Sequence, residues 1–362
     1  MSAKQRVKLA ALWSMRAIGL FALARWLTRR QFAIIGWHGV SILDEHRDQP
    51  NYFLAPETLR QRLVFLNKHF RIVSLETLVE QHAQGTIQPR QVALTFDDAM
   101  YDFRESAMPI LKEFSAPATV YVVSSTLDAP TRADMLMLRH TILSSRLSHS
   151  PEGLPELPVP MPLSTEDERF DCLRELRQAI FKLPQEGPER PEYVDRMMAA
   201  FEVDLSEKVR RRVWDYMTND EVQATAVDGY SMQPHSHLHR FCPEILDELA
   251  EDTRICKERL EKTTGQPAVD YCYPAGRWNR AAAKIIAEEG MRSGVTCGAG
   301  LNSPRTPIHS LKRFVTGDDF SQLEFEFAVS GLQSLIHYFT KPALRNEPPE
   351  VGGSSADAPR DS

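Results

Sequence analysis

The chain has 362 residues, of which 42% are apolar and 25% are charged, and its net charge is −6 at neutral pH. These proportions are typical of a globular protein with one large domain or two ordinary ones, and they exclude a collagen-like or fully disordered chain. The five cysteines are scattered and contain no Cys-x-x-Cys pair, so they predict neither a disulfide framework nor a cysteine-rich zinc site. We expect a reducing compartment.

Residues 1–30 combine basic charge with apolar side chains. They contain seven Lys and Arg residues and no Asp or Glu, so the remainder of the chain carries −13. At helical spacing one face collects Leu9, Leu12, Trp13, Leu20, Leu23 and Leu27. The longest uncharged run, residues 17–24, is far shorter than the roughly 18–20 residues that span a bilayer. We therefore expect one helix that either lies on an anionic membrane surface or docks on the body of the protein.

Apolar, β-branched runs alternate with helical patterns along the rest of the chain. Strands are predicted at residues 32–37, 92–96, 118–123, 230–235, 269–274, 293–297 and 311–315. Helices are predicted at residues 56–70, 104–114, 244–265 and 279–290. Such alternation indicates an α/β fold with a parallel sheet, either closed as a barrel or doubly wound.

Two segments depart from this alternation. Residues 125–228 contain charged helical patterns and a proline-rich link but no predicted strand. They predict a helical insertion within a main domain of residues 31–340. Residues 341–362 have the composition of a disordered tail.

Two groups of metal-binding residue types follow predicted strands. Asp97 and Asp98 follow the strand at 92–96, and His235, His237 and His239 follow the strand at 230–235. An aspartate pair can also cap a helix, and a histidine cluster can decorate a surface loop. In a parallel barrel, however, the carboxyl ends of all strands meet on one face, so these groups would converge there.

Asp98, His235 and His239 would form a ligand set of two histidines and one carboxylate. Such a set leaves coordination positions open for water and substrate, which indicates a catalytic rather than a structural metal site. Asp97 would lie beside the metal as a base. His237 is expected to point to solvent or to support a ligand.

Four motifs, in order, resemble the polysaccharide deacetylase family of carbohydrate esterases, also called the NodB-homology family. They are IIGWHGV (34–40), TFDD (95–98), HSxxH (235–239) and YPxGRWN (273–279), and the first and last resemble the branch that deacetylates poly-N-acetylglucosamine. The resemblance covers about residues 31–335. It implies a distorted (β/α)7 barrel that removes N-acetyl groups from an oligo- or polysaccharide with a divalent cation, usually Zn²⁺.

Carried over motif by motif, the resemblance assigns a role to each residue. It implies Asp98, His235 and His239 as metal ligands and Asp97 as the general base. The main-chain N–H of Ala275 would stabilise the oxyanion.

The same resemblance implies a proton donor and substrate contacts. His38 is the expected acid that protonates the leaving amine, with His309 as the alternative. Tyr273 and Arg277 are expected at the substrate, and Arg277 could also hold Asp97 ionised.

Two further positions can be compared with the family pattern: one departs from it and the other matches it. Ala99 stands where the family has a glycine, which restricts the backbone there. Arg313 matches a common basic position near the last strand, without a clear role.

The leading hypothesis is a deacetylase of a bacterial polysaccharide or its precursor, working at the cytoplasmic face of the membrane. The alternatives are a non-haem iron oxygenase, a catalytically inactive carbohydrate-binding barrel, and a hydrolase of another non-peptide C–N or ester bond. No nucleic acid is expected as a partner.

Overall fold

A parallel sheet forms the centre of the computed structural model, which describes residues 3–128, 131–154, 157, 159–182 and 189–340. The predicted tail at 341–362 lies outside these residues. The sheet order β10-β1-β5-β6-β7, with short β4 beside β5, comprises β1 (Ala33–Trp37), β4 (Arg71–Ile72), β5 (Gln91–Phe96), β6 (Thr119–Val122), β7 (Ser231–Pro234) and β10 (Phe314–Val315). Every residue of β1 and β5 is buried, which explains why their sequences are nearly continuously apolar.

Strands β8 (Asp270–Cys272) and β9 (Ser293–Val295) pair with each other and complete the barrel between β7 and β10. The side-chain oxygen of Gln233 in β7 accepts hydrogen bonds from the N–H groups of Val269 (2.8 Å) and Asp270 (2.9 Å), in place of a regular ladder. A single parallel bridge joins Val295 to Leu311. The predicted distorted (β/α)7 barrel is therefore confirmed, and its distortion lies where these ladders are interrupted.

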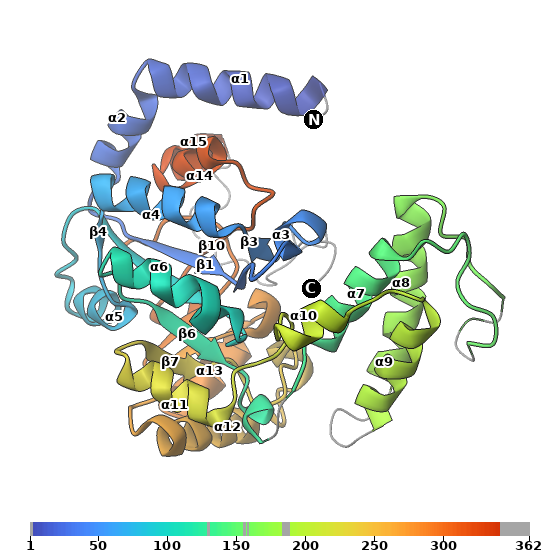
Figure 1. The fold of residues 1–362 in the computed structure, drawn as a ribbon. Helices are drawn as coiled ribbons and strands as arrows, with labels where there is room; N and C mark the ends of the chain where they lie inside the picture. The colour runs from blue at the N-terminus through green and yellow to red at the C-terminus, as the bar shows by residue number, and fades with distance from the viewer. Residues whose placement is uncertain (1–2, 129–130, 155–156, 158, 183–188, 341–362) are drawn as a thin grey trace.

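Helices cover the outside of the barrel (Figure 1). They are α4 (Pro56–His69), α5 (Leu75–Gln84), α6 (Met108–Glu113), α11 (Asn219–Val227), α12 (Leu249–Thr264), α13 (Arg280–Glu288) and α14 (Gln322–Val329). The predicted helices at 56–70 and 279–290 are confirmed. The helix predicted at 244–265 begins later, because Cys242–Glu244 forms a short 3-10 turn first, and α5 was not predicted.

The insertion forms a helical lobe beside the barrel (Figure 1). It contains α7 (Asp134–Ser144), α8 (Glu166–Phe181), α9 (Glu189–Ala200) and α10 (Ser206–Arg210). The lobe has its own apolar core, which also includes Phe53, from the separate short strand β3 (Phe53–Leu54), and Met100, which follows β5. Helix α11, by contrast, buries Val222 and Ala226 in the main core, so the insertion ends before α11 rather than at residue 228.

The N-terminal segment is two helices, so the single helix predicted over residues 1–30 is wrong. Helices α1 (Ala3–Ala17) and α2 (Leu20–Leu27) are bent by 69° relative to each other. The bend follows Gly19, whose φ of 82° is left-handed backbone that glycine adopts without steric cost. Helix α1 packs on α14, and α2 packs on α15 (Leu332–Thr340). Within the described chain no helix has the length and hydropathy to cross a bilayer by itself, although the bent pair together does.

Candidate active site

The three predicted metal ligands meet at the carboxyl ends of β5 and β7. Nε2 of His235 lies 3.4 Å from Oδ1 of Asp98, and Nε2 of His239 lies 3.5 Å from the same oxygen. All three donor atoms lie within 4.8 Å of one another. For comparison, the corners of a tetrahedron centred on zinc are about 3.3 Å apart when each donor lies about 2.0–2.1 Å from the ion. The donor set therefore fits a divalent cation that keeps open positions.

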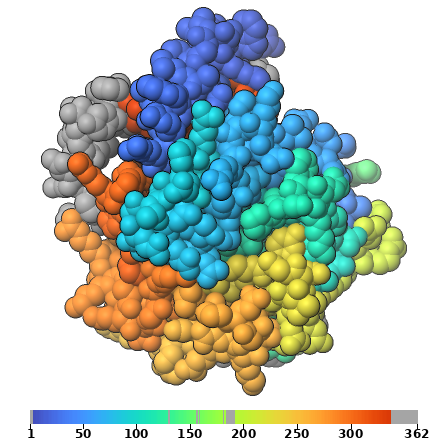
Figure 2. Space-filling model, turned by 90° about the vertical axis from the view of Figure 1, so that its left-hand side faces the viewer, coloured from blue at the N-terminus to red at the C-terminus, as the bar shows by residue number. Residues whose placement is uncertain are grey.

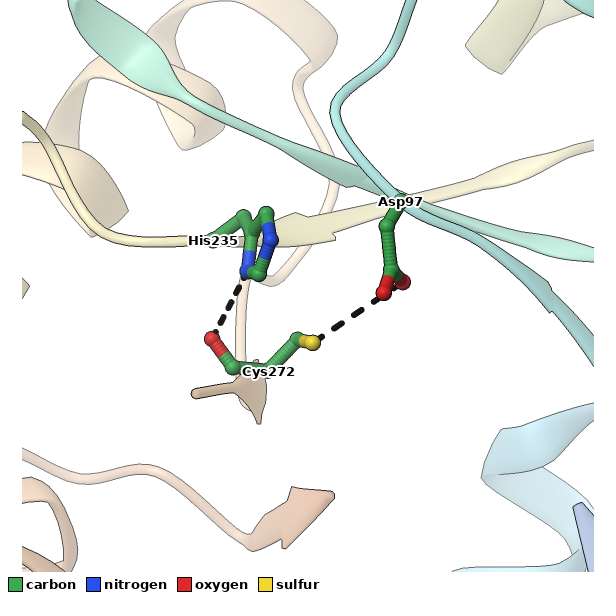
Figure 3. Close-up of side chains that lie close together, drawn as sticks. All are labelled: Asp97, His235 and Cys272. Carbon is green, nitrogen blue, oxygen red and sulfur yellow. Dashed lines mark hydrogen bonds between the residues drawn. The ribbon is translucent and has the colours of Figure 1, made fainter. Parts of the chain in front are cut away.

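His235 is held in the tautomer that a metal ligand needs. Its Nδ1–H donates to the main-chain oxygen of Cys272 at 2.9 Å, which leaves the lone pair of Nε2 free (Figure 3). The loop to His239 is closed by Ser236, whose hydroxyl accepts a hydrogen bond from the His239 N–H at 2.7 Å. This turn explains the HSxxH spacing, because it returns the second imidazole to within 4.9 Å of the first, ring centroid to centroid.

His237 lies apart from the ligand set. Its Nδ1 is 2.9 Å from the hydroxyl of Ser124 at the end of β6, and its N–H donates to Asp252. These contacts tie the histidine loop to the barrel wall, so the structure gives His237 a supporting position.

Asp97 is a buried carboxylate that accepts two hydrogen bonds from Arg313. Nη1 of Arg313 donates to Oδ1 of Asp97 at 2.6 Å and Nη2 donates to Oδ2 at 2.8 Å, while both side chains are almost completely buried. Burial alone would raise the pKa of Asp97, but the charge and hydrogen bonds of Arg313 outweigh it and lower that pKa below its ordinary value. Asp97 is therefore ionised at neutral pH.

Arg313 makes this pairing, and the expected pairing of Asp97 with Arg277 is wrong. Arg277 forms an ion pair with Glu244 at 2.9 Å and lies over the ring of Phe241. Arg313 precedes the short strand β10, which adjoins β1 in the sheet, and from there its guanidinium reaches Asp97. The sequence signal for Arg313 was its basic position near the last strand, to which no role had been given.

His38 follows β1 and adjoins the same space. Its Nε2 lies 4.0 Å from Oδ2 of Asp97, and its side chain is 24% exposed. His309, the alternative acid, lies elsewhere, because its Nε2 contacts the main-chain oxygen of Met291, which precedes β9, at 2.9 Å. Of the two candidates, only His38 can face a substrate bound at the metal ligands.

Comparison with known proteins places this geometry in a family. The family model described as polysaccharide deacetylase matches residues 84–154 and 191–294, which include both aspartates, all three histidines of the HSxxH loop and the YPxG turn. Over these two stretches the chain matches the polysaccharide deacetylase family.

Two curated relatives match shorter parts of the chain. A poly-β-1,6-N-acetyl-D-glucosamine N-deacetylase of Escherichia coli (strain K12) is 35% identical over 101 residues, which are 27% of this chain and 15% of that protein. The enzyme of the same name from Staphylococcus epidermidis is 23% identical over 87 residues, 24% of this chain and 30% of that protein. The matches thus span less than a third of either relative.

Two solved structures share the fold. The deacetylase PplD of Streptococcus pyogenes, solved in complex with acetate, has a TM-score of 0.54 at 18% identity and covers 83% of this chain and 98% of its own. IcaB from Ammonifex degensii has a TM-score of 0.54 at 14% identity, with coverages of 83% and 97%. At these identities the likeness concerns the fold alone.

Tyr52 is a residue of this site that the sequence motifs do not include. Its hydroxyl donates to Oδ2 of Asp98, the carboxylate oxygen that does not face the histidines. Its ring stacks on His38 with centroids 4.6 Å apart. Tyr52 thus connects a metal ligand to the expected acid, but it lies between motifs, where no local pattern marks it.

We expect Tyr52→Phe to weaken metal binding by about tenfold, because it removes the hydrogen bond that orients Asp98. Titration of the metal-free protein with Zn²⁺ measures this directly. An unchanged affinity would show that Asp98 is positioned without the hydroxyl. Tyr101→Phe is the matched control, since Tyr101 lies beside Arg212 and makes no contact with Asp98.

The YPxG turn contributes its backbone to the site rather than the Tyr273 side chain. Tyr273 is fully buried and donates its hydroxyl proton to the main-chain oxygen of His309, so its expected contact with substrate is wrong. Ala275 is partly exposed, and no acceptor for its N–H occurs among the described residues. That N–H is therefore available to an oxyanion. Gly276 (φ 65°) is required beside it, because a Cβ there would lie 2.4 Å from the main-chain nitrogen of Cys297.

Left-handed backbone is concentrated at this site. Asp98 (φ 70°), Ala99 (φ 57°), His239 (φ 54°) and Ala275 (φ 52°) all adopt it without being glycine. Each such residue costs on the order of 1–3 kcal/mol, which the surrounding structure must offset. Ala99 therefore takes up the glycine-like conformation despite its side chain.

Proposed function

We propose that the protein is a metal-dependent hydrolase that removes N-acetyl groups from amino sugars of a bacterial polysaccharide or its precursor. The observation that carries this proposal is a buried, ionised carboxylate, Asp97, directly beside the three donor atoms of Asp98, His235 and His239. A binding barrel without activity has no need of such a base. The names of the E. coli and S. epidermidis relatives favour poly-N-acetylglucosamine as the substrate to test first.

Asp98, His235 and His239 would hold the cation, for which we propose Zn²⁺, because two imidazoles and one carboxylate at these separations suit its tetrahedral preference. When bound, the ion would lower the pKa of a water molecule and polarise the acetyl carbonyl. The remaining steps belong to the protein's own groups.

Asp97 would accept the proton of the attacking water, since Arg313 keeps it ionised and fixes both of its oxygens. The N–H of Ala275 would donate to the oxyanion that develops on the acetyl oxygen. His38 would give a proton to the leaving amine, from a position close to Asp97 and braced by the Tyr52 ring. Base and acid thus come from neighbouring strands, β5 and β1.

Release of free acetate from N-acetylglucosamine oligomers is the direct test. We expect acetate from β-1,6-linked oligomers, loss of activity with a chelator, and recovery when Zn²⁺ is restored. Parallel assays with an acetyl ester distinguish an amide hydrolase from an esterase. A metal-loaded protein that releases no acetate from any N-acetylated sugar would contradict the proposal.

A further inference from the structure

Helix α2 presents an apolar stripe to solvent. Leu23, Trp26 and Leu27 are each about half exposed, and their i, i+3, i+4 spacing places them on one face. Ile18, in the bend before α2, is 74% exposed. The opposite face of α2 packs against the body of the protein, where Phe21 and Ala24 are buried. We call Ile18, Leu23, Trp26 and Leu27 the α2 face.

The ridge formed by α1 and α2 stands at one edge of the molecule (Figure 2). Along α1 two more large apolar side chains, Val7 and Trp13, are more than 60% exposed. Of the five tryptophans of the chain, only Trp13 and Trp26 are exposed; the other three are buried. A soluble surface seldom gathers so many large apolar groups unless something covers them.

Positive charge borders this apolar surface. Lys4, Arg6, Arg29 and Arg30 form no ion pair with any carboxylate among the described residues, and Arg29 lies over the Trp26 ring at 4.7 Å. Lys8 and Arg16, in contrast, point to the body and pair with Glu324 (2.5 Å) and Glu326 (3.1 Å). Lys8 and Arg16 thus attach α1 to the body of the protein, whereas the other four cations remain available to a partner.

His69, at the end of α4, lies near several cations. The pKa of His69 is lowered, first by burial and then by the charges of Arg25, Lys68 and Arg90. Of these, Arg90 comes from outside α1 and α2 and lies beside the end of α2, because its N–H donates to the main-chain oxygen of Arg29.

We propose that the α2 face docks the protein on an anionic lipid bilayer. Exposed tryptophan and leucine rimmed by unpaired arginine is the composition that partitions into the headgroup boundary of a membrane, and the charges favour anionic lipid. The inner leaflet of a cell membrane supplies such lipid. This inference is independent of the proposed reaction.

The position of α2 leaves the catalytic site accessible in the docked state. The main-chain oxygen of Arg29 accepts a hydrogen bond from the N–H of Arg90, next to the first residue of β5, at 2.8 Å. The catalytic groups Asp97 and His38 follow the other ends of β5 and β1. Docking face and active site therefore lie at opposite ends of the same strands.

Vesicle sedimentation of the full chain tests the proposal. We expect binding to vesicles of phosphatidylcholine with phosphatidylglycerol, at least about tenfold weaker binding to phosphatidylcholine alone, and weakening at high salt. Binding should shift Trp fluorescence to the blue, and lipids brominated near the headgroups should quench it, because the exposed tryptophans enter the membrane.

Variants make the test specific. Leu23→Ser/Trp26→Ser/Leu27→Ser should reduce binding by about tenfold or more while acetate release from soluble oligomers is retained. Val209→Ser/Val227→Ser, at exposed apolar positions of α10 and α11, is the matched control and should bind as the wild type does. Arg29→Glu/Arg30→Glu should lose the preference for anionic lipid.

Two outcomes would overturn the proposal. One is a triple variant that is folded and binds vesicles as tightly as the wild type. The other is a wild-type chain that does not bind vesicles but forms a dimer in light scattering, while the triple variant is a monomer. A second copy of the chain would then cover the α2 face.

Discussion

Asp97→Asn should reduce acetate release by about 10²–10⁴-fold, the range expected when a general base is removed. Metal binding should persist, because Asp98, His235 and His239 are unchanged. The asparagine amide can still accept from Arg313 through its oxygen but cannot take a proton from water. Initial rates at saturating substrate, with metal content measured on the same preparation, separate loss of the base from loss of the ion.

Asp247→Asn is the matched control for this substitution. Asp247 is exposed, and among the described residues it forms no ion pair. We expect wild-type rates from it. If Asp97→Asn retained activity within a few-fold, the base would have to be another group and the mechanism proposed for Asp97 would be wrong.

Arg313→Met should move the acid limb of the pH–rate profile to higher pH. In the wild type Arg313 lowers the pKa of Asp97, so the base stays ionised well into the acid range. Without the guanidinium, burial dominates and raises that pKa, so a larger fraction of Asp97 is protonated at neutral pH. The profile of kcat against pH measures the shift, and Arg313→Lys should restore part of it.

The same substitution should lower stability by about 3–5 kcal/mol, because it leaves a buried carboxylate unpaired. In the wild type the folded pKa of Asp97 is below its ordinary value of 3.8. Its stabilising contribution is therefore present above that value and is lost as the pH falls through the folded pKa. Thermal unfolding at a series of pH values shows this dependence, and Arg313→Met should reverse its sign, because a raised folded pKa gives stability that is lost as the pH rises.

Arg292→Met provides the control for a broken ion pair outside the site. Arg292 binds Asp270 at 2.7 Å, at the start of β8. Its removal should destabilise the fold without moving the pH–rate profile. An identical shift in both variants would mean that the change reflects general destabilisation rather than the pKa of Asp97.

The sequence was sufficient to predict those site residues whose side chains can bind a metal or a proton and that directly follow a strand. Asp97, Asp98 and His235 each follow a largely buried strand, and a parallel barrel brings strand ends together, so their convergence could be expected. Sequence patterns were less informative where the residue that contacts a site side chain comes from a distant element. The arginine beside Asp97 was assigned to Arg277, in a recognised motif, whereas the register of β10 on β1 delivers Arg313.

Local geometry accounts for the other differences. Tyr52 reaches Asp98 through a loop that no periodicity describes. Gly19 bends the N-terminal segment, because its left-handed φ ends the helical path that the apolar spacing alone would continue. Tyr273 stands in a motif near the substrate, but packing with Tyr271 and Trp278 turns its ring into the core.

Metal analysis of purified variants determines whether one cation is held by Asp98, His235 and His239. Inductively coupled plasma mass spectrometry should find about one equivalent of metal in the wild type, in His237→Ala and in Asp97→Asn, because none of these lacks a ligand. His235→Ala should contain almost none and should be inactive. Full metal content in His235→Ala together with its loss in His237→Ala would contradict the ligand assignment and, with it, the proposed hydrolysis.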